Sequence, residues 1–557
     1  MNLLRVWNDR GGGGGPRRDR FLVALICAVV FVRVVYVLSY PLIIEGDGET
    51  YYALLLESRA HLLHATGYVF FSLPILLLAN LLGTEPANLL GYFQHALSAA
   101  AVTVLYLALK RIVPRWISFL ICLPLGIDAQ LVAAAGTTRP EFLQADILIL
   151  VISSAVFGLT SASQRAKTLF YLGAGVLGVA GYLTKYNFLP ALAFCLVPLF
   201  DGELQWKSRF WMLGKACLGG MVLFVVFIAT FHYPTTGSFQ LNLEHGWIHI
   251  LKLKEADIPL LPTNGIATQK YIVLSDSLPA MGAGPGPWKK IDEVPDAVRA
   301  PFRQKWSALL ATNDAGSVRE ALAASEKGGT AYHHPNSFMP IYYYLGLKEG
   351  EKLLRAVFLE GVRGYSGRYF SNVRKSLIQS AVFSNVYLPY QPIPGVYQPS
   401  PLFKWARPPF LSARAGFYKA VDWAVATPEQ LATLADQIWY PGARLFSFLS
   451  FIKYIPTSCL WIVMLAGFVL LPVFVARHRR LRLAETLFIL VALALFGEMI
   501  FAAALFVFRS KELVLCQPLI YLMMGLSLSL WVEFISTSRR STEQIGQSGG
   551  EAKSADI

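Results

Sequence analysis

Long apolar runs recur along this chain, and they restrict it to a membrane fold. A helix needs about 20 mostly apolar residues to cross the hydrocarbon core of a bilayer. Charged residues make up only 15% of the 557 residues, compared with about 25% in soluble domains. The sequence therefore predicts an α-helical polytopic membrane protein with about ten transmembrane helices. The predicted spans are 21–40, 89–109, 116–136, 141–159, 168–184, 187–200, 211–232, 457–476, 486–508 and 513–534.

The basic residues predict how these spans are oriented. One further apolar stretch, 68–82, contains Pro74 and is shorter than a straight span. If this stretch lies on the membrane surface, the basic clusters at 110–115 and 477–482 fall on the same side as the basic N-terminus, as the positive-inside rule requires. We therefore predict that both termini are cytoplasmic. The net charge of +14 then orients the spans and does not indicate a nucleic-acid partner.

Composition also predicts the domain organisation. The segment after the seventh span is too long to be a simple connection, so it must have its own fold, and its periodicity predicts a mostly helical periplasmic domain with helices around 296–325, 351–380 and 427–452. The predicted units are a cytoplasmic basic leader (1–20), a seven-helix membrane module (21–232) with an acidic first periplasmic loop (41–88), the periplasmic domain (233–456), three C-terminal spans (457–537) and a disordered cytoplasmic tail (538–557).

Three carboxylates stand in the first predicted outer loop. Glu45, Asp47 and Glu49 follow the first span, and no basic residue lies within nine positions on either side. The next stretch, 50–64, predicts a juxtamembrane helix in the membrane interface. As a helix it places four polar residues on one face, namely Thr50, Glu57, His61 and His64.

Five short motifs follow one another along the chain. They are "GDGETYYAL" (46–54), "HATGY" (64–68), "RPEFLQADILIL" (139–150), "GYLTKYNF" (181–188) and "RSKELVLCQPL" (509–519). Their order, together with a large segment after span seven, resembles the GT-C glycosyltransferases that use polyprenyl-phosphate sugars, such as the aminoarabinose transferases of lipid A and the protein O-mannosyltransferases. "HATGY" departs from the family's His–Pro–Pro/Gly–Tyr turn at Ala65 and Thr66, and the fifth motif lacks the family's tyrosine.

The resemblance implies a glycosyltransferase with a GT-C-like fold in a bacterial inner membrane, active on the periplasmic side. It implies Asp47 as the general base, with Glu49 second; a carboxylate in that role accelerates transfer by roughly 10²–10⁴-fold. Fixed cations stabilise the leaving lipid phosphate, and the sparse cations available on the outer side are Arg33, Lys185, Arg509 and Lys511. The candidate substrate-binding residues are Tyr51, His64, Tyr68, Glu141, His333 and His334.

The expected partners are a polyprenyl-phosphate sugar donor, membrane lipids and an envelope glycan, lipid or protein as acceptor. No cofactor and no metal site is predicted, although dependence on a divalent cation stays open. Simpler interpretations also stay open: the acidic loop as a solvated loop, Glu141 as a helix cap, and the outer cations as interface anchors. Two other functions compete, a transporter or flippase of lipid-linked sugars and an O-antigen ligase or polymerase. The sequence identifies neither the sugar nor the acceptor.

Overall fold

The structure is a computed structural model of the chain. It describes residues 19–39, 43–44, 47–61, 64–239, 241, 245–278, 296–324, 338–382, 421–422, 445, 449, 457–478, 482–505 and 516–554.

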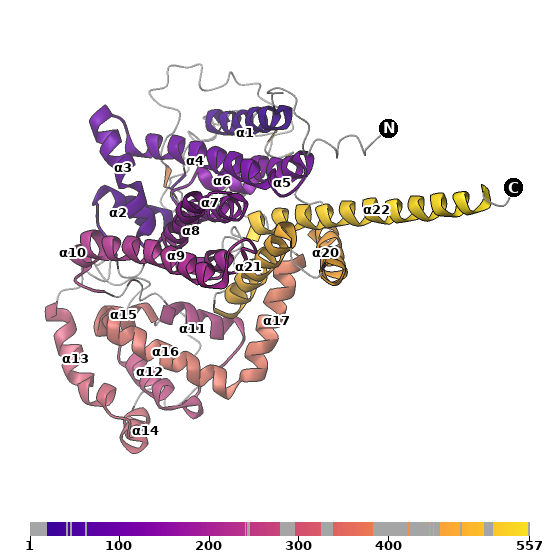
Figure 1. The fold of residues 1–557 in the computed structure, drawn as a ribbon. Coiled ribbons are helices and arrows are strands. Elements are labelled where there is room, and N and C mark those ends of the chain that lie inside the picture. Colours follow the sequence, from indigo (N-terminus) through magenta and orange to yellow (C-terminus); the bar gives the residue numbers. More distant parts are fainter. Residues whose placement is uncertain are drawn as a thin grey trace, which may run out of the picture.

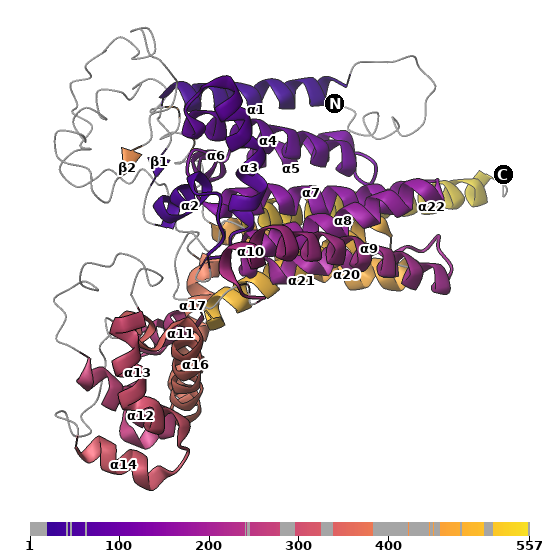
Figure 2. The same cartoon turned by 90° about the vertical axis from the view of Figure 1, so that its left-hand side faces the viewer.

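The described helices form a membrane bundle and a separate helical domain. In Figure 2 the bundle helices run side by side, with α2 and the helical domain at one end and the last turns of α22 at the other. We call the first of these the α2 end. The bundle contains α1 (Arg20–Ser39), α4 (Pro86–Leu109), α5 (Arg115–Ile127), α6 (Ala129–Ala135), α7 (Pro140–Thr160), α8 (Gln164–Thr184), η2 (Tyr186–Phe200), α9 (Trp206–Phe227), η3 (Ile228–His232), α10 (Tyr233–Thr236), α20 (Thr457–His478), α21 (Leu483–Leu505) and α22 (Cys516–Ser554).

The bundle confirms a polytopic helical membrane protein. Among the described residues, seven helices are long and apolar enough to cross a bilayer. They coincide with predicted spans one, two, four, five, seven, nine and ten. The seven stretches are Arg20–Leu38, Pro86–Leu109, Pro140–Thr160, Gln164–Thr184, Trp206–Thr236, Leu483–Ala504 and Cys516–Ser536.

The other three predicted spans contain shorter apolar helices. The third is divided into α5 and α6 at Asp128, whose carboxylate accepts hydrogen bonds from the Leu131 backbone and, at 2.8 Å, from the Tyr521 hydroxyl. The sixth, η2, is a 3₁₀ helix of 15 residues. Because a 3₁₀ helix rises about 2.0 Å per residue, these residues still extend about 30 Å, the thickness of the hydrocarbon core. In α20 the apolar stretch covers Ile462–Ala476.

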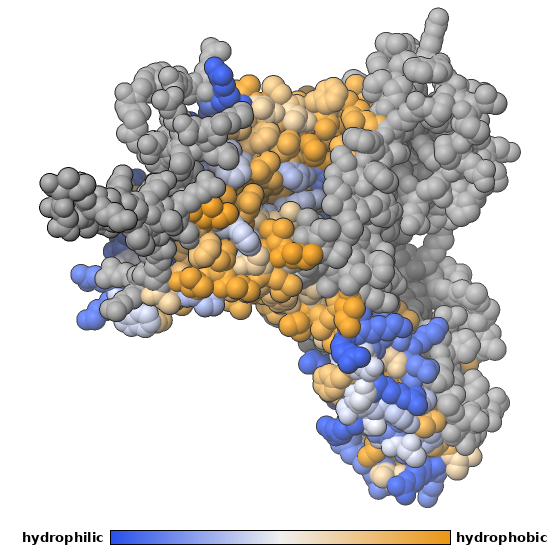
Figure 3. Space-filling view, turned by 90° about the vertical axis from the view of Figure 1, so that its right-hand side faces the viewer, coloured by the Kyte–Doolittle hydropathy of each residue, from blue (hydrophilic) through white to orange (hydrophobic). Residues whose placement is uncertain are grey.

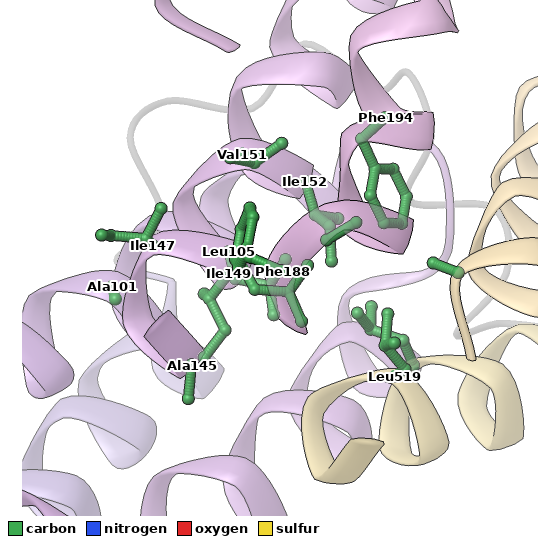
Figure 4. Close-up of a cluster of buried hydrophobic side chains, with 14 of the residues drawn as sticks. Ala101, Leu105, Ala145, Ile147, Ile149, Val151, Ile152, Phe188, Phe194 and Leu519 are labelled. Carbon is green, nitrogen blue, oxygen red and sulfur yellow. The ribbon is translucent and has the colours of Figure 1, made fainter. Parts of the chain in front are cut away.

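Helix α7 lies at the centre of the bundle. It packs against α4, α8 and η2, and nearly all of its side chains are buried. Figure 4 shows Ala145, Ile149 and Ile152 of α7 among side chains from α4, η2 and α22. Any polar side chain on α7 is therefore enclosed by the bundle and must find its partners inside it.

The α2 end of the bundle is closed by two further helices, α2 (Asp47–Leu56) and α3 (Gly67–Leu82). Helix α2 ends at Leu56, eight residues before the end of the helix predicted over 50–64, because Ser58 adopts a left-handed backbone with φ of 51°. The predicted face of four polar residues is therefore not formed by one helix. Beside α2, strand β1 (Ile43–Ile44) pairs in parallel with β2 (Val421–Asp422).

The helical domain has its own hydrophobic core. Tyr271, Tyr342 and Leu354 are fully buried in it, whereas the domain surface is largely hydrophilic, unlike the apolar flank of the bundle (Figure 3). The predicted helix 296–325 is divided in two, and so is 351–380, while 427–452 lies largely outside the described residues. The helices are α11 (His245–Glu255), η4 (Pro262–Asn264), α12 (Ile266–Ser277), α13 (Asp296–Ala311), α14 (Ala315–Ala323), α15 (Phe338–Leu345), α16 (Leu347–Gly364) and α17 (Ser366–Val382).

The C-terminal segment differs from the prediction. Helix α22 continues to Ser554, and it projects beyond the bundle in Figure 1, whereas the sequence predicted disorder from residue 538. A helix that already exists as a membrane span extends without a new nucleation step, so a polar sequence with several good helix formers can continue it.

Candidate active site

The start of α2 is held against the start of α7. The Thr138 hydroxyl donates to the Gly48 carbonyl at 3.0 Å. A Cβ atom on Gly48 would lie 2.7 Å from that hydroxyl oxygen, so this approach requires glycine. Asp47 and Glu49, the predicted general base and its alternative, flank Gly48 in the chain. Their backbone is thus placed beside the first turn of α7, and their side chains lie outside the part of the structure that is described.

An ion pair joins the start of α7 to the end of α8. The Lys185 ammonium lies 2.8 Å from Glu141 Oε1, and the two side chains are only 11% and 7% exposed. Glu141 stands in the first turn of α7, where the helix dipole favours a negative charge. Gln144, one turn further along α7, donates to the Lys185 carbonyl at 2.7 Å. Two residues that were predicted separately therefore form one buried pair at the α2 end.

Three predicted substrate-binding residues form an aromatic cluster at the same end. Tyr51 of α2 contacts His64 and Tyr68, with ring centroids 5.4 and 5.8 Å apart. His64 also stacks on His61. Tyr68 lies close enough to Glu141 for the charge of that carboxylate to act on the Tyr68 hydroxyl. The aromatic cluster is therefore near the ion pair.

Helix α3 is fixed directly against the end of α8. A Cβ on Gly67 would lie 2.4 Å from the Leu183 carbonyl carbon, so the two backbones are in close contact. The next residue, Tyr68, donates its hydroxyl proton to Gln94 Oε1 at 2.7 Å. Gln94 in turn donates to the carbonyls of Ala135 and Thr137. This series of contacts joins α3, α4 and α8 to the end of α6 and to the segment that leads into α7.

Two further buried charged residues lie deeper in the bundle. Arg33 of α1 is 3% exposed, and it donates to the Gly126 carbonyl and, at 2.6 Å, to the Ser98 hydroxyl. Asp146 of α7 is also 3% exposed, and it is close enough for its charge to act on Arg33. Asp146 follows Glu141 by five residues on α7, which is about 7.5 Å along a helix axis. These two charges therefore lie inside the bundle, below the level of the Glu141–Lys185 pair.

Sequence reasoning missed Asp146, Gln94 and His95. Each is a polar residue inside an apolar span, and a buried ionisable residue in a span indicates function or pairing by default. That signal was present for Asp146 within "RPEFLQADILIL" and for the other two within "GYFQHAL" (91–97). His95 is buried, and its ring lies 5.3 Å from that of Tyr36.

Four predicted site residues, Arg509, Lys511, His333 and His334, lie outside the described residues. Of the predicted phosphate-binding cations, Arg33 and Lys185 are described. Lys185 pairs with the carboxylate of Glu141, whereas Arg33 donates to Gly126 and Ser98. Whether the cations gather around the Asp47 carboxylate stays a prediction. Within the described residues no group of three histidine, cysteine or acidic side chains could hold a metal ion.

Comparison with known proteins leaves the family open. No protein-family model and no curated protein matches the chain. Among solved structures, the chain is similar to the crystal structure of ArnT from Cupriavidus metallidurans bound to undecaprenyl phosphate. The identity is 12%, the TM-score is 0.30, and the match covers 92% of this chain and 78% of that one. A superposition of this quality does not establish a common fold, so the site described above rests on the contacts within this chain.

Proposed function

We propose that the protein is an integral-membrane glycosyltransferase that moves a sugar from a polyprenyl-phosphate donor to a cell-envelope acceptor. The observation that supports this most is the meeting of α2, α3, α7 and α8 at one end of the bundle. The acidic start of α2, the Glu141–Lys185 pair and the aromatic cluster of Tyr51, His64 and Tyr68 all belong to that end. The helical domain lies at the same end (Figures 1 and 2).

In the proposed reaction Asp47 is the general base. Its carboxylate takes the proton of an acceptor hydroxyl, the hydroxyl oxygen bonds to the anomeric carbon of the sugar, and the bond from that carbon to the phosphate oxygen breaks. Polyprenyl phosphate leaves with the bonding electrons. General-base catalysis of this kind contributes roughly 10²–10⁴-fold. The close contact of Gly48 with Thr138 fixes the backbone that carries the base.

Lys185 is the described cation best placed to meet the leaving phosphate. It lies at the α2 end, at the C-terminus of α8, and its present partner is a single-charge carboxylate. A phosphate carries more charge and more acceptor oxygens than a carboxylate, so it competes well for an ammonium group. Arg33 is less suited, because it is 3% exposed and already donates to the Gly126 carbonyl and the Ser98 hydroxyl. Arg509 and Lys511 remain proposed partners of the same phosphate.

The proposed location is a bacterial inner membrane with the α2 end in the periplasm. The basic clusters at 110–115 and 477–482 belong to the opposite end in this orientation, as the positive-inside rule requires. A lipid-linked donor would then reach the site from within the outer leaflet. The acceptor would approach from the side of the helical domain.

One observation favours the transporter alternative. Arg33 and Asp146 are both buried inside the bundle, and charged residues within spans commonly mark a substrate or ion pathway. A transporter would move the lipid-linked sugar between leaflets without breaking the bond between sugar and phosphate. The two functions therefore differ in one measurable event, the release of free polyprenyl phosphate.

The test uses the purified full-length protein in lipid nanodiscs, a panel of polyprenyl-monophosphate sugars and a crude envelope acceptor fraction. We expect free polyprenyl phosphate to appear together with labelled acceptor. Heat-inactivated protein is the control for spontaneous donor hydrolysis. Lipid-sugar movement in proteoliposomes without bond cleavage would contradict the transferase proposal and favour the transporter. Cleavage only of a diphosphate-linked oligosaccharide would favour the ligase or polymerase.

A further inference from the structure

Helix α17 connects the helical domain to the bundle. On the domain side, Val373 packs against the domain core and Tyr369 is part of it. On the bundle side, Leu377 packs against the membrane core, and the Tyr369 hydroxyl donates to the carbonyl of Ala504, one residue before the end of α21. Helix α17 also contacts α20 and α21. It is therefore anchored at the level where the apolar spans end.

The direction of α17 differs from that of the spans. In Figure 1 it crosses the direction of the bundle helices, and both views place it at the junction between domain and bundle. A helix that crosses the spans at their ends lies close to the plane of the membrane surface. This is the position of an interfacial helix.

The exposed face of α17 combines large apolar side chains with basic ones. Phe370 and Ile378 are 63% and 55% exposed, and Arg374 between them is also exposed. Steps of four residues place these three on one stripe of the helix. Position 377 is next to this stripe, and Leu377 contacts the membrane core. The apolar stripe is thus on the flank of α17 that borders the bundle.

The basic residues on this face pair with no carboxylate in the part of the chain that the structure describes. Arg374 and the adjacent exposed Lys375 form no ion pair with any described residue, whereas Arg368 at the start of the helix donates to the Asp257 carbonyl. Exposed aromatic and aliphatic residues beside unpaired arginine and lysine are the usual composition at a membrane–water boundary.

We propose that α17 binds the surface of the lipid bilayer. Phe370 and Ile378 enter the boundary between headgroups and acyl chains, and Arg374 and Lys375 contact acidic lipid phosphates. The occupant is a lipid surface because α17 packs on the membrane core through Leu377 and is bound to the end of α21 through Tyr369, and because the charge of the two basic residues matches that of acidic headgroups. The contact would hold the helical domain in one position over the α2 end.

Depth measurement tests the apolar part of this proposal. Single cysteines are introduced as Phe370→Cys and Ile378→Cys in a protein in which the exposed Cys27 and Cys217 are changed to alanine, labelled with bimane and reconstituted in nanodiscs that contain headgroup- or shallow-chain spin-labelled lipid. Interfacial helices enter the boundary by about 5–10 Å, so we expect strong quenching at both positions. Arg319→Cys on the exposed face of α14, far from the bundle in Figure 2, is the matched control and should stay unquenched. The protein without an introduced cysteine measures background labelling.

Two outcomes would overturn the proposal. Quenching at 370 and 378 no stronger than at 319 would show that the stripe faces water. A blue-shifted bimane emission without lipid quenching would show that protein covers the stripe, either another part of this chain or a second copy. Repeating the measurement at several protein-to-lipid ratios would distinguish another part of this chain from a second copy, and either result would reject the lipid proposal.

The basic residues are tested by lipid composition. We expect stronger quenching at position 378 in bilayers that contain phosphatidylglycerol than in phosphatidylcholine alone, and this difference should disappear in the double variant Arg374→Gln and Lys375→Gln. Arg319→Gln removes an exposed arginine from α14 and should leave the difference intact. A lipid preference that survives the double variant would rule out these two side chains as the phosphate contacts.

Discussion

The two ends of α8 carry buried lysines in contrasting surroundings. At the end far from α2, Lys167 contacts two carboxylates, Asp201 at 2.7 Å and Glu203 at 2.9 Å. Asp201 also accepts from the Tyr171 hydroxyl. At the α2 end, Lys185 contacts Glu141 beside the aromatic cluster and the acidic start of α2. The first arrangement joins the start of α8 to the short segment between η2 and α9, and the second lies where four helices meet.

The contrast shows how buried charge can serve stability at one end and function at the other. A buried pair with extra hydrogen bonds, such as Lys167 with Asp201, has its charges satisfied by the side chains around it and needs no ligand. A pair at the meeting point of α2, α3, α7 and α8 lies where a substrate has to bind if the protein is a transferase. Variants at the two ends should therefore separate stability from activity.

The largest expected effect is on activity at the α2 end. Asp47→Asn keeps the shape of the side chain and removes the base, so transfer should fall by roughly 10²–10⁴-fold. Glu57→Gln is the control, because Glu57 lies just after α2 on an exposed position and pairs with Arg59. Single-turnover transfer and a melting curve are measured for both. Activity of Asp47→Asn close to that of the Glu57 control would place the base elsewhere, with Glu49 next.

The next effect is on stability at the far end of α8. Asp201→Asn removes the carboxylate that is 2% exposed, and we expect a loss of about 3 kcal/mol in unfolding free energy, the lower part of the range for breaking a buried pair, since Glu203 still faces Lys167. Glu203→Gln is the control at an exposed carboxylate and should lose at most about 1 kcal/mol. Unfolding in mild detergent, followed by tryptophan fluorescence, measures both. Equal losses would mean that burial does not distinguish the two acids.

A third variant compares the two lysines directly. Lys185→Gln should raise the KM for the donor by about tenfold, equal to about 1.4 kcal/mol, because the charge it meets belongs to the leaving phosphate. The KM for the acceptor should change little. Lys167→Gln should instead lower stability and leave both KM values unchanged in the fraction that remains folded. An equal rise in both KM values for Lys185→Gln would indicate a structural role at this end as well.

The smallest effect is a pH dependence at the start of α1. Burial raises the pKa of Asp19, but hydrogen bonds from Tyr106 and the Leu22 backbone, with the charge of Lys110, outweigh it and hold the pKa below its ordinary value. A depressed pKa stabilises the folded state above the unfolded pKa, and that contribution is lost as pH falls through the folded value. We expect a loss of less than about 1 kcal/mol below about pH 4.

Asp19→Asn should flatten this part of the pH–stability curve. Asp314→Asn on exposed α14 serves as a comparison, since the pKa of Asp314 is also lowered, by hydrogen bonds from Ser317 and Gly316, but in the helical domain. An unchanged curve for Asp19→Asn would assign the acid sensitivity to other carboxylates.

The sequence alone determined the membrane class and most spans, because the length and apolarity of a span follow directly from the thickness of the bilayer. It also identified Glu141, Lys185, Tyr51, His64 and Tyr68 as candidates, through motifs that lie far apart in the chain. It could not show that these residues meet, since no local pattern records which helix ends are neighbours. Whether the GT-C resemblance extends to the fold stays a prediction.

Only the tertiary structure decided how charge is paired. Glu141 could have been a helix cap and Lys185 an interface anchor, but the packing of α7 against α8 brings them to 2.8 Å. Asp146 looked like one polar residue in an apolar run, and the packing of α4 against α7, with α1 packed against α4, buries it close enough to Arg33 for its charge to act there. A charge inside a bilayer has to be paired, but the choice of partner depends on helix packing, which is a property of the whole bundle and not of any single span.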